Sequence, residues 1–312
     1  MLNKIKSVMF GHAIGDALGV PVEFCSREQM KRKPVTTMTG YGTYDVPKGC
    51  WSDDTSMAMC ALESLANGNV DYDEIMKNFM NWYKYGKFTP TGVLFDIGRT
   101  CLMAIENYMR GCKPEDCGLS DVRSNGNGSL MRIHPFVLYA YYNGIDGDEF
   151  EKLIAYASAL THGHYCSIDG CIIYAYVLIE LIKNPCKKAI YDGISKAKNA
   201  IAQCDNYYHR LYSNVPIEDL HESQIKSSGY VVDSLEASLW CLLTTNNYQE
   251  CVLKAVNLGE DTDTVAAIAG GLAGALYGVD SIPNEWMSNL KKRNYIEQIC
   301  EDACNTWRKI EV

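Results

Sequence analysis

Two short stretches of the sequence each place carboxylates and hydroxyls directly before a run of helix-forming residues. They are WSDDTSMA (51–58) and GEDTDTVAAIAGGLAGALYG (259–278). The oxygen-bearing side chains of interest are Ser52, Asp53 and Asp54 in the first stretch and Asp261, Asp263 and Thr264 in the second. One or two such residues suffice to cap a helix, and acids suit its positive N-terminus. Capping therefore explains each stretch alone, but it leaves surplus carboxylates when the two are considered together.

The surplus acids have a chemical use if the two helix starts lie close together. Four aspartates would repel one another unless cations lay between them. Hydroxyl and carboxylate oxygens, without His or Cys, suit Mg²⁺, Mn²⁺ or Ca²⁺ rather than zinc. An EF-hand does not fit DTDTVA, because Val265 and Ala266 occupy places that need a ligand and a turn glycine. The pattern predicts a binuclear metal site, which orients substrate oxygens and activates water for hydrolysis.

Further candidate residues lie outside these stretches. Glu23 follows a glycine-rich helix and a proline, where a plain surface acid is an equally good interpretation. Asp96 stands in the apolar setting LFDIG, so its carboxylate is either paired or has a perturbed pKa. His162 lies in the loop-like THGH, where His more often has a structural role, and His164 is less informative. Tyr230, in the turn GYVVD, serves either core packing or stacking on a base.

A glycine-rich segment, SNGNGS, adds a candidate anion site. Its glycines expose backbone N–H groups before a predicted helix, an arrangement suited to a diphosphate. An ordinary turn and cap is the simpler alternative. The residues involved are Asn125, Gly126, Asn127, Gly128 and Ser129.

The elements that must position these residues are predicted to be helices. Strand signals are few, with short alternation at 35–44, and no linker divides the chain. We therefore expect an all-α fold, one compact multi-helix domain over residues 1–312. Helical periodicity covers residues 3–19, 55–66, 73–84, 94–110, 128–142, 148–160, 167–183, 189–204, 233–244, 248–256, 264–277 and 293–310.

Two of these helices carry glycine at every fourth residue. The glycines are Gly11, Gly15 and Gly19 in one helix and Gly270, Gly274 and Gly278 in the other. Each costs the helix about 1 kcal/mol relative to Ala. That cost is tolerated where backbones approach closely, so both helices are predicted to be central.

Composition excludes several classes of protein. The net charge of −9 and pI near 5.2 argue against a nucleic-acid surface or an anionic membrane surface. The 14 cysteines are scattered, without C-x-x-C, and no secretory signal opens the chain, which favours a cytoplasmic protein with buried thiols. The longest apolar run, 171–182, is too short to span a bilayer and is predicted to be a buried helix. We expect a monomer without a membrane or nucleic-acid partner.

Seven ordered segments resemble the signature segments of the ADP-ribosylglycohydrolase family. The match runs from residue 11 to 278, nearly the whole chain. The segments are GHAIGDALGVPVEF (11–24), WSDDTSMA (51–58), FDIGRT (95–100), SNGNGSLMRIHP (124–135), THGHYCSIDG (161–170), GYVVDSLEASLW (229–240) and AVNLGEDTDTVAAIAGGLAGALYG (255–278).

The resemblance implies an all-α fold with two Mg²⁺ or Mn²⁺ ions at the base of an ADP-ribose cleft. It implies that the six oxygen-bearing side chains of the two stretches are the metal ligands. Ser52 stands where relatives often have Thr, and Glu260 stands where they commonly have a second Gly. Glu260 is not expected to be a ligand, because its side chain can point away.

The resemblance also implies roles for the remaining candidates. Glu23 becomes a flap residue that contacts substrate or water, and Asp96 lies near the scissile bond. His162 and 125–129 contact phosphate or ribose, and Tyr230 stacks on adenine. Catalytic candidates are Glu23, Asp96, Asp54 and Asp261. The division of acid and base roles between Glu23 and Asp96 stays open.

The implied function is hydrolysis of an ADP-ribosylated acceptor, either a protein or a small ADP-ribose derivative. ADP-ribosyl-arginine is the first choice of linkage. ADP-ribosyl-serine, poly(ADP-ribose) and O-acetyl-ADP-ribose share the same ADP-ribose half and are alternatives. A non-catalytic ADP-ribose-binding relative and a phosphohydrolase that uses the same metals are competing hypotheses.

Overall fold

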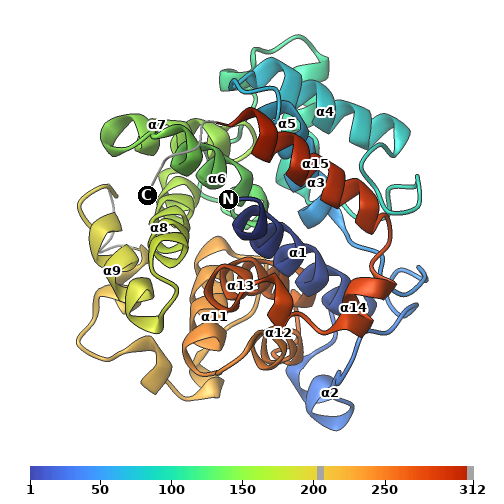
Figure 1. The fold of residues 1–312 in the computed structure, drawn as a ribbon, viewed down its shortest axis with the longest axis vertical. Coiled ribbons are helices and arrows are strands. Elements are labelled where there is room, and N and C mark those ends of the chain that lie inside the picture. Colours follow the sequence, from blue (N-terminus) through green and yellow to red (C-terminus); the bar gives the residue numbers. More distant parts are fainter. Residues whose placement is uncertain (202–206, 308–312) are drawn as a thin grey trace.

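Helices form the regular secondary structure of residues 1–201 and 207–307, the parts of the chain that this computed structural model describes (Figure 1). The α-helices are α1 (Leu2–Gly19), α2 (Arg27–Arg32), α3 (Asp53–Leu65), α4 (Tyr72–Tyr85), α5 (Arg99–Met109), α6 (His134–Asn143), α7 (Gly147–Ala159), α8 (Tyr165–Lys183), α9 (Lys187–Ala197), α11 (Val231–Leu243), α12 (Tyr248–Asn257), α13 (Thr262–Tyr277), α14 (Asn284–Asn289) and α15 (Arg293–Thr306). No strand occurs in the described residues, where two isolated bridges join Leu119 to His162 and Gly126 to Tyr230. The prediction of an all-α multi-helix fold is confirmed.

Short 3₁₀ turns connect several of these helices. They are η1 (Val20–Val22), η2 (Pro114–Asp116), η3 (Leu130–Arg132), η4 (His209–Tyr212), η5 (Ile217–Asp219), η6 (Glu222–Gln224) and η7 (Val279–Ser281).

Helices α1 and α13 form the centre of the molecule, as their glycines predict. They lie side by side in Figure 1, with α3, α8, α11, α12 and α15 packed around them. A Cβ added at Gly11 would meet the carbonyl oxygen of Gly270, and one at Gly274 would meet the carbonyl oxygen of Ser7. The two backbones therefore touch where the glycines lie. Gly278 is an exception, because it ends α13 with φ +85° and an added Cβ would meet nothing within 4 Å.

Several helix ends follow local capping chemistry. Asp71 accepts a hydrogen bond from the Glu74 amide at the start of α4, and Gly86 ends that helix with φ 64°. Asn247 caps α12 in the same way. These side chains satisfy N–H groups that a helix start leaves without partners.

Some predicted boundaries are wrong for identifiable reasons. The helix predicted at 94–110 begins only at Arg99, because residues 94–98 run irregularly past the cleft described below. The segment predicted at 128–142 splits into η3 and α6, where Pro135 lies in the first turn of α6. Residues 35–44 form no strand. Residues 202–204 and 308–310 of two predicted helices lie outside the described residues.

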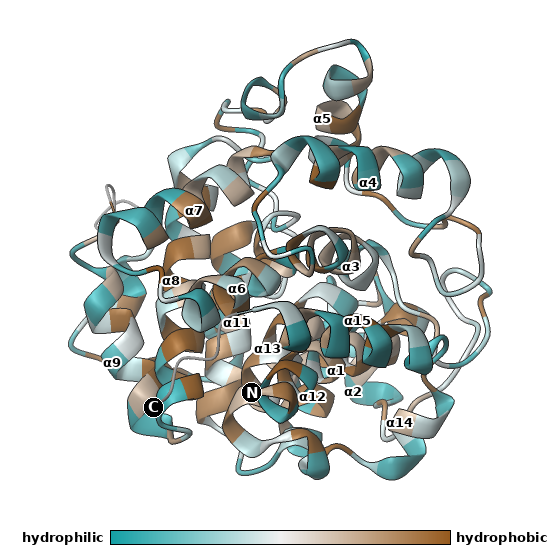
Figure 2. Ribbon diagram, turned by 45° about the horizontal axis from the view of Figure 1, so that its top comes forward, coloured by the Kyte–Doolittle hydropathy of each residue, from teal (hydrophilic) through white to brown (hydrophobic). Residues whose placement is uncertain are grey.

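The apolar run at 171–182 lies in α8 and is a buried helix, as predicted. By length and composition α8 passes as a membrane span, but 78% of its apolar window is buried inside the protein, as in a core helix. Figure 2 shows apolar residues gathered on central helices such as α6 and α8, whereas α4 and α9 present many hydrophilic residues. Within the described part of the chain, 13 cysteines are free and most are buried.

Candidate active site

The starts of α3 and α13 meet, as the two acidic stretches predict. Ser52 is the N-cap of α3, and its hydroxyl donates to Asp54 Oδ2 over 3.1 Å. The Thr264 hydroxyl, from the first turn of α13, donates to the same Asp54 oxygen over 3.2 Å. Asp261 caps α13 and Asp263 follows in its first turn. A direct hydrogen bond therefore joins residues that lie 210 positions apart in the chain.

A further carboxylate, Asp16 of α1, clamps the start of α3. Its Oδ1 accepts from the Ser52 amide (2.9 Å) and hydroxyl (3.0 Å). Its Oδ2 accepts from the Thr55 amide (3.0 Å) and hydroxyl (2.6 Å). The sequence reasoning missed this residue. The available signal is an aspartate within GHAIGDALG, where every other residue except His12 is small or apolar.

Burial and mutual repulsion raise the pKa of the converging carboxylates. Burial raises the pKa of Asp53, Asp54 and Asp263 well above the usual value, and nearby carboxylates raise each of them further. Asp54 Oδ1 is buried and has no hydrogen-bond partner. A divalent cation would supply that partner and remove the repulsion. The oxygen donors here thus fit hard metal ions.

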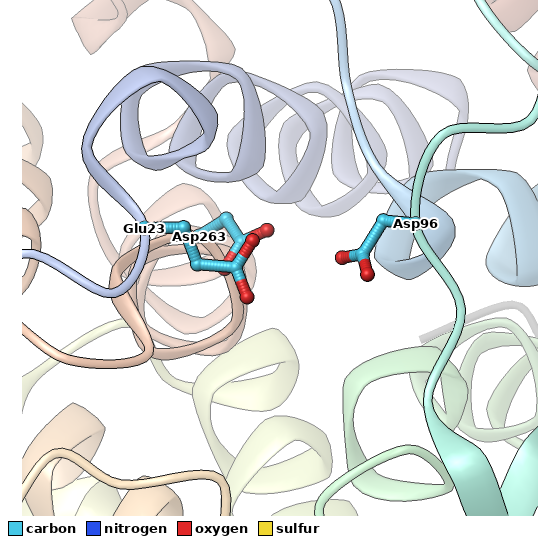
Figure 3. A group of neighbouring side chains, drawn as sticks. All are labelled: Glu23, Asp96 and Asp263. Atoms are coloured by element: carbon cyan, nitrogen blue, oxygen red, sulfur yellow. The ribbon is translucent and has the colours of Figure 1, made fainter. Parts of the chain in front are cut away.

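Glu23 and Asp96 join this cluster from two other segments. One carboxylate oxygen from each lies within 4.8 Å of the others and of an Asp263 oxygen, and Figure 3 shows the three side chains facing a common space. Glu23 is 6% exposed, so the surface-acid interpretation is wrong. Burial, and then the charge of Asp96, raises the pKa of Glu23 to about 8.

The loop that carries Glu23 is tied to the loop before α13. The Phe24 amide donates to the Glu260 carbonyl and the Glu260 amide donates to the Cys25 carbonyl, each over 2.7 Å. Phe24 (φ 66°) and Glu260 (φ 63°) both have left-handed backbones that favour glycine. The Glu260 side chain is exposed, in keeping with the expectation that it is no ligand.

A cleft of about 330 Å³ opens above the carboxylates. Glu23, Asp53, Asp96 and Asp261 form its acidic part, and the Thr264 side chain lies with them. Its other lining residues are Phe24, Ile97, Gly98, Arg99, Thr100, Cys101, Gly126, Asn127, Gly128, Met131, His162 and Gly229. Arg99 is the one cationic side chain in this lining, and it begins α5, so it adds to the positive N-terminus of that helix. The sequence reasoning did not single out Arg99.

The SNGNGS segment only partly faces the cleft. Gly126, Asn127 and Gly128 line it. The side-chain amide of Asn127, however, donates to Asp261 Oδ2 (2.7 Å) and to the Ser234 hydroxyl (2.9 Å). Asn125 accepts a hydrogen bond from Ser167 away from the lining. Ser129 is fully buried against Ser158. The segment therefore offers the cleft mainly glycine backbone, and its asparagine orients a carboxylate.

His162 lies against this glycine backbone. A Cβ added at Gly128 would come within 3.0 Å of His162 Cε1. His162 Nδ1 lies 2.8 Å from the Thr161 hydroxyl, which accepts from the buried guanidinium of Arg132 over 2.7 Å. Burial and the charge of Arg132 lower the pKa of His162 to about 3, so its imidazole is neutral.

Tyr230 and His164 lie beside the cleft rather than in its lining. Tyr230 is the N-cap of α11, is 36% exposed, and adjoins the lining residue Gly229. Its hydroxyl lies 3.5 Å from Cys166 Sγ. His164 caps α8 and stacks on Tyr165 at 4.1 Å, so its ring has a structural role.

Comparison with known proteins finds one matching family and several relatives. The family described as ADP-ribosylglycohydrolase matches residues 1–311. The chain is 32% identical to the ADP-ribosylarginine hydrolase Tri1 of Pseudomonas putida, over 96% of this chain and 78% of that protein. It is 31% identical to the ADP-ribosyl-[dinitrogen reductase] glycohydrolase of Rhodospirillum rubrum, over 90% and 87%. A solved structure titled ADP-ribosylglycohydrolase-related protein complex superposes with a TM-score of 0.82, 28% identity and 98% coverage of both chains.

Proposed function

The chain belongs to the ADP-ribosylglycohydrolase family, and on this premise we propose that it releases ADP-ribose from modified arginine side chains by metal-dependent hydrolysis. Its place in the family makes it a hydrolase of ADP-ribosylated substrates. The proposal goes further in naming the arginine linkage and the metals. Two relatives about 30% identical are named ADP-ribosylarginine hydrolases, which supports that linkage.

The observation that carries the proposal is the convergence of α3 and α13 beneath one cleft. Their two starts bring together six oxygen-bearing side chains, and the hydrogen bond from the Thr264 hydroxyl to Asp54 links one start to the other. The side chains that would hold two Mg²⁺ or Mn²⁺ ions are Ser52, Asp53, Asp54, Asp261, Asp263 and Thr264. Such ions, when bound, orient sugar hydroxyls and lower the pKa of a water molecule.

The reaction breaks the bond between ribose C1″ and the guanidine nitrogen of the acceptor. The oxygen of a water molecule forms the new bond to C1″, and the departing nitrogen gains a proton. Asp54 and Asp261 would orient the water or accept its proton. Glu23 and Asp96 adjoin Asp263 and would contact the leaving group.

The other cleft residues would bind the ADP-ribose half of the substrate. Gly126 and Gly128 have no side chain, so a substrate can come close to their backbone. His162 has a neutral imidazole that can hydrogen-bond to a phosphate or ribose oxygen. Arg99 and the start of α5 supply positive charge for a diphosphate. Tyr230, beside Gly229, is exposed enough for adenine to stack on it.

The test is mass spectrometry of products from arginine-modified and serine-modified peptides. Each peptide is incubated with Mg²⁺, with Mn²⁺ and with a chelator. We expect free ADP-ribose and unmodified peptide from the arginine substrate, and neither product in chelator. Release from serine alone would refute the arginine assignment, and AMP as product would indicate a phosphohydrolase. Mg²⁺-dependent binding of ADP-ribose without any release would indicate a binding protein.

A further inference from the structure

Three aromatic side chains stand beside Glu23 and Asp96 at the rim of the cleft. We call Phe24, Tyr44 and Phe95 the rim aromatics. The Tyr44 ring lies 4.9 Å from the Phe95 ring and 6.5 Å from the Phe24 ring, centroid to centroid. Phe24 directly follows Glu23 and Phe95 directly precedes Asp96 in the chain. Each of the two carboxylates therefore has an aromatic neighbour, and Tyr44 links them.

Hydrogen bonds tie together the segments that carry Phe24 and Tyr44. The Thr43 amide donates to the Pro21 carbonyl (3.1 Å), and the Thr43 hydroxyl donates to the Glu23 carbonyl (2.8 Å). Phe24 is fixed by its 2.7 Å hydrogen bond to Glu260. Phe24 nevertheless leaves 70% of its surface exposed, although its left-handed backbone is unfavourable for a bulky residue. Strain of this kind is concentrated at functional sites.

Of the rim aromatics, Phe24 lines the cleft beside Glu23, whereas Tyr44 and Phe95 lie outside the lining. The cation–π contacts among the described residues involve Phe79, Tyr212 and Trp240, so no described lysine or arginine stacks on the rim aromatics. Of the four carboxylates in the cleft lining, Asp53 and Asp261 would hold metal ions, which leaves Glu23 and Asp96 beside the single cation Arg99. Glu23 Oε2 is buried, belongs to this lining, and has no hydrogen-bond partner. A cation brought by the substrate would find both an aromatic face and an unpaired carboxylate oxygen.

We infer that the rim aromatics and Glu23 form the subsite that binds the guanidinium group of the acceptor arginine. This inference rests on the proposed function, because it concerns the leaving half of the same substrate. A guanidinium is a flat, weakly hydrated cation that stacks on aromatic rings and donates hydrogen bonds to carboxylates. A serine acceptor has neither property. The subsite would therefore select arginine linkages over serine linkages that carry the same ADP-ribose.

The test compares Phe24→Leu with Phe24→Trp. Leucine keeps apolar bulk without an aromatic face, whereas tryptophan keeps the face. For an ADP-ribosyl-arginine peptide with Mg²⁺, we expect Phe24→Leu to lower kcat/KM by about fivefold to thirtyfold. Phe24→Trp should restore it to within about twofold of the unaltered protein. Tyr85→Leu, at an exposed tyrosine outside the cleft lining, is the matched control and should change nothing.

A binding measurement separates the acceptor subsite from the ADP-ribose site. The Kd of ADP-ribose in Mg²⁺ should be the same for Phe24→Leu and the unaltered protein. An equal loss of ADP-ribose affinity and kcat/KM would overturn the inference, as would an unchanged kcat/KM for the arginine peptide. If the unaltered protein itself does not cleave the arginine peptide, the proposed function fails, and the inference fails with it.

Discussion

The packing of α1 on α13 predicts that one methyl group at Gly15 will damage both the fold and the site. A Cβ added there would meet the carbonyl oxygen of Ala266, and it would lie 2.6 Å from that carbonyl carbon and 3.0 Å from the Ala267 nitrogen. All three are backbone atoms, so no side-chain rotation relieves the overlap. The two helices must separate, and Asp263 lies one turn before Ala266.

The size of the effect follows from two opposed terms. Replacing Gly by Ala inside a helix stabilises it by about 1 kcal/mol. Overpacking typically costs about 1–3 kcal/mol, and the rigid neighbours here place Gly15→Ala at the upper end. The net expectation is a loss of about 2 kcal/mol in the free energy of unfolding. With a urea m-value of about 3 kcal/mol/M, the midpoint falls by about 0.7 M.

Urea unfolding followed by circular dichroism measures this difference, with Gly271→Ala as the matched control on α13. A Cβ at Gly271 would lie 3.0 Å from the Tyr174 hydroxyl, the end of a side chain, and 3.7 Å from His12 Cβ. Gly271→Ala should therefore be neutral or up to about 1 kcal/mol stabilising. The affinity for Mg²⁺ should fall in Gly15→Ala but not in Gly271→Ala. A Gly15→Ala protein as stable as Gly271→Ala would refute the close-contact argument.

Three further predictions concern the carboxylates and the strained loop. Asp263→Ala should abolish Mg²⁺ binding in calorimetry and turnover together, and full activity in this variant would rule out the binuclear site. Mg²⁺ should raise Tm more at pH 8 than at pH 5. The pKa of Glu23 is raised from 4.5 to about 8 in the folded protein, so the folded state binds this proton more tightly than the unfolded chain does. The free energy of unfolding of the metal-free protein is therefore highest at low pH and falls as pH rises through that range. An equal Tm shift at both pH values would contradict the electrostatic account. Glu260→Gly should stabilise the protein by about 0.5–1 kcal/mol, because φ is 63° there, and it should keep turnover because its side chain is exposed. A lower Tm would show that the left-handed backbone carries no strain.

The sequence was most informative where the signal is local. The residue types and spacing at Ser52 and the two aspartates after it predict the start of a helix, and α3 begins at Asp53. Glycines at Gly11 and Gly15 predicted close helix contact, because the absence of Cβ has few other uses inside a helix. Gly278 broke the pattern because it ends α13 and has left the contact.

The sequence was least informative about which distant side chains meet. Asp16 accepts hydrogen bonds from Ser52 and Thr55, which lie 36 and 39 positions away in the chain. The residues next to Asp16 in the sequence do not predict those partners. Asn127 was predicted to bind substrate, and the sequence did not show that its side-chain amide also donates to Asp261, 134 positions away. Tyr44 lies in a segment whose alternation resembled a strand, and only its docking on Phe95 reveals the rim aromatics.

Spacing along the chain thus determined the all-α class, the glycine-lined helix pair and the two acidic helix starts, because periodicity and capping are properties of neighbouring residues. Tertiary packing alone decided that Glu23 and Asp96 lie within 4.8 Å of Asp263, and that Asp16 anchors α3. It also decided the character of the carboxylates. Their raised pKa values come from burial and from charges that packing brings together. No short stretch of sequence could therefore predict these pKa values.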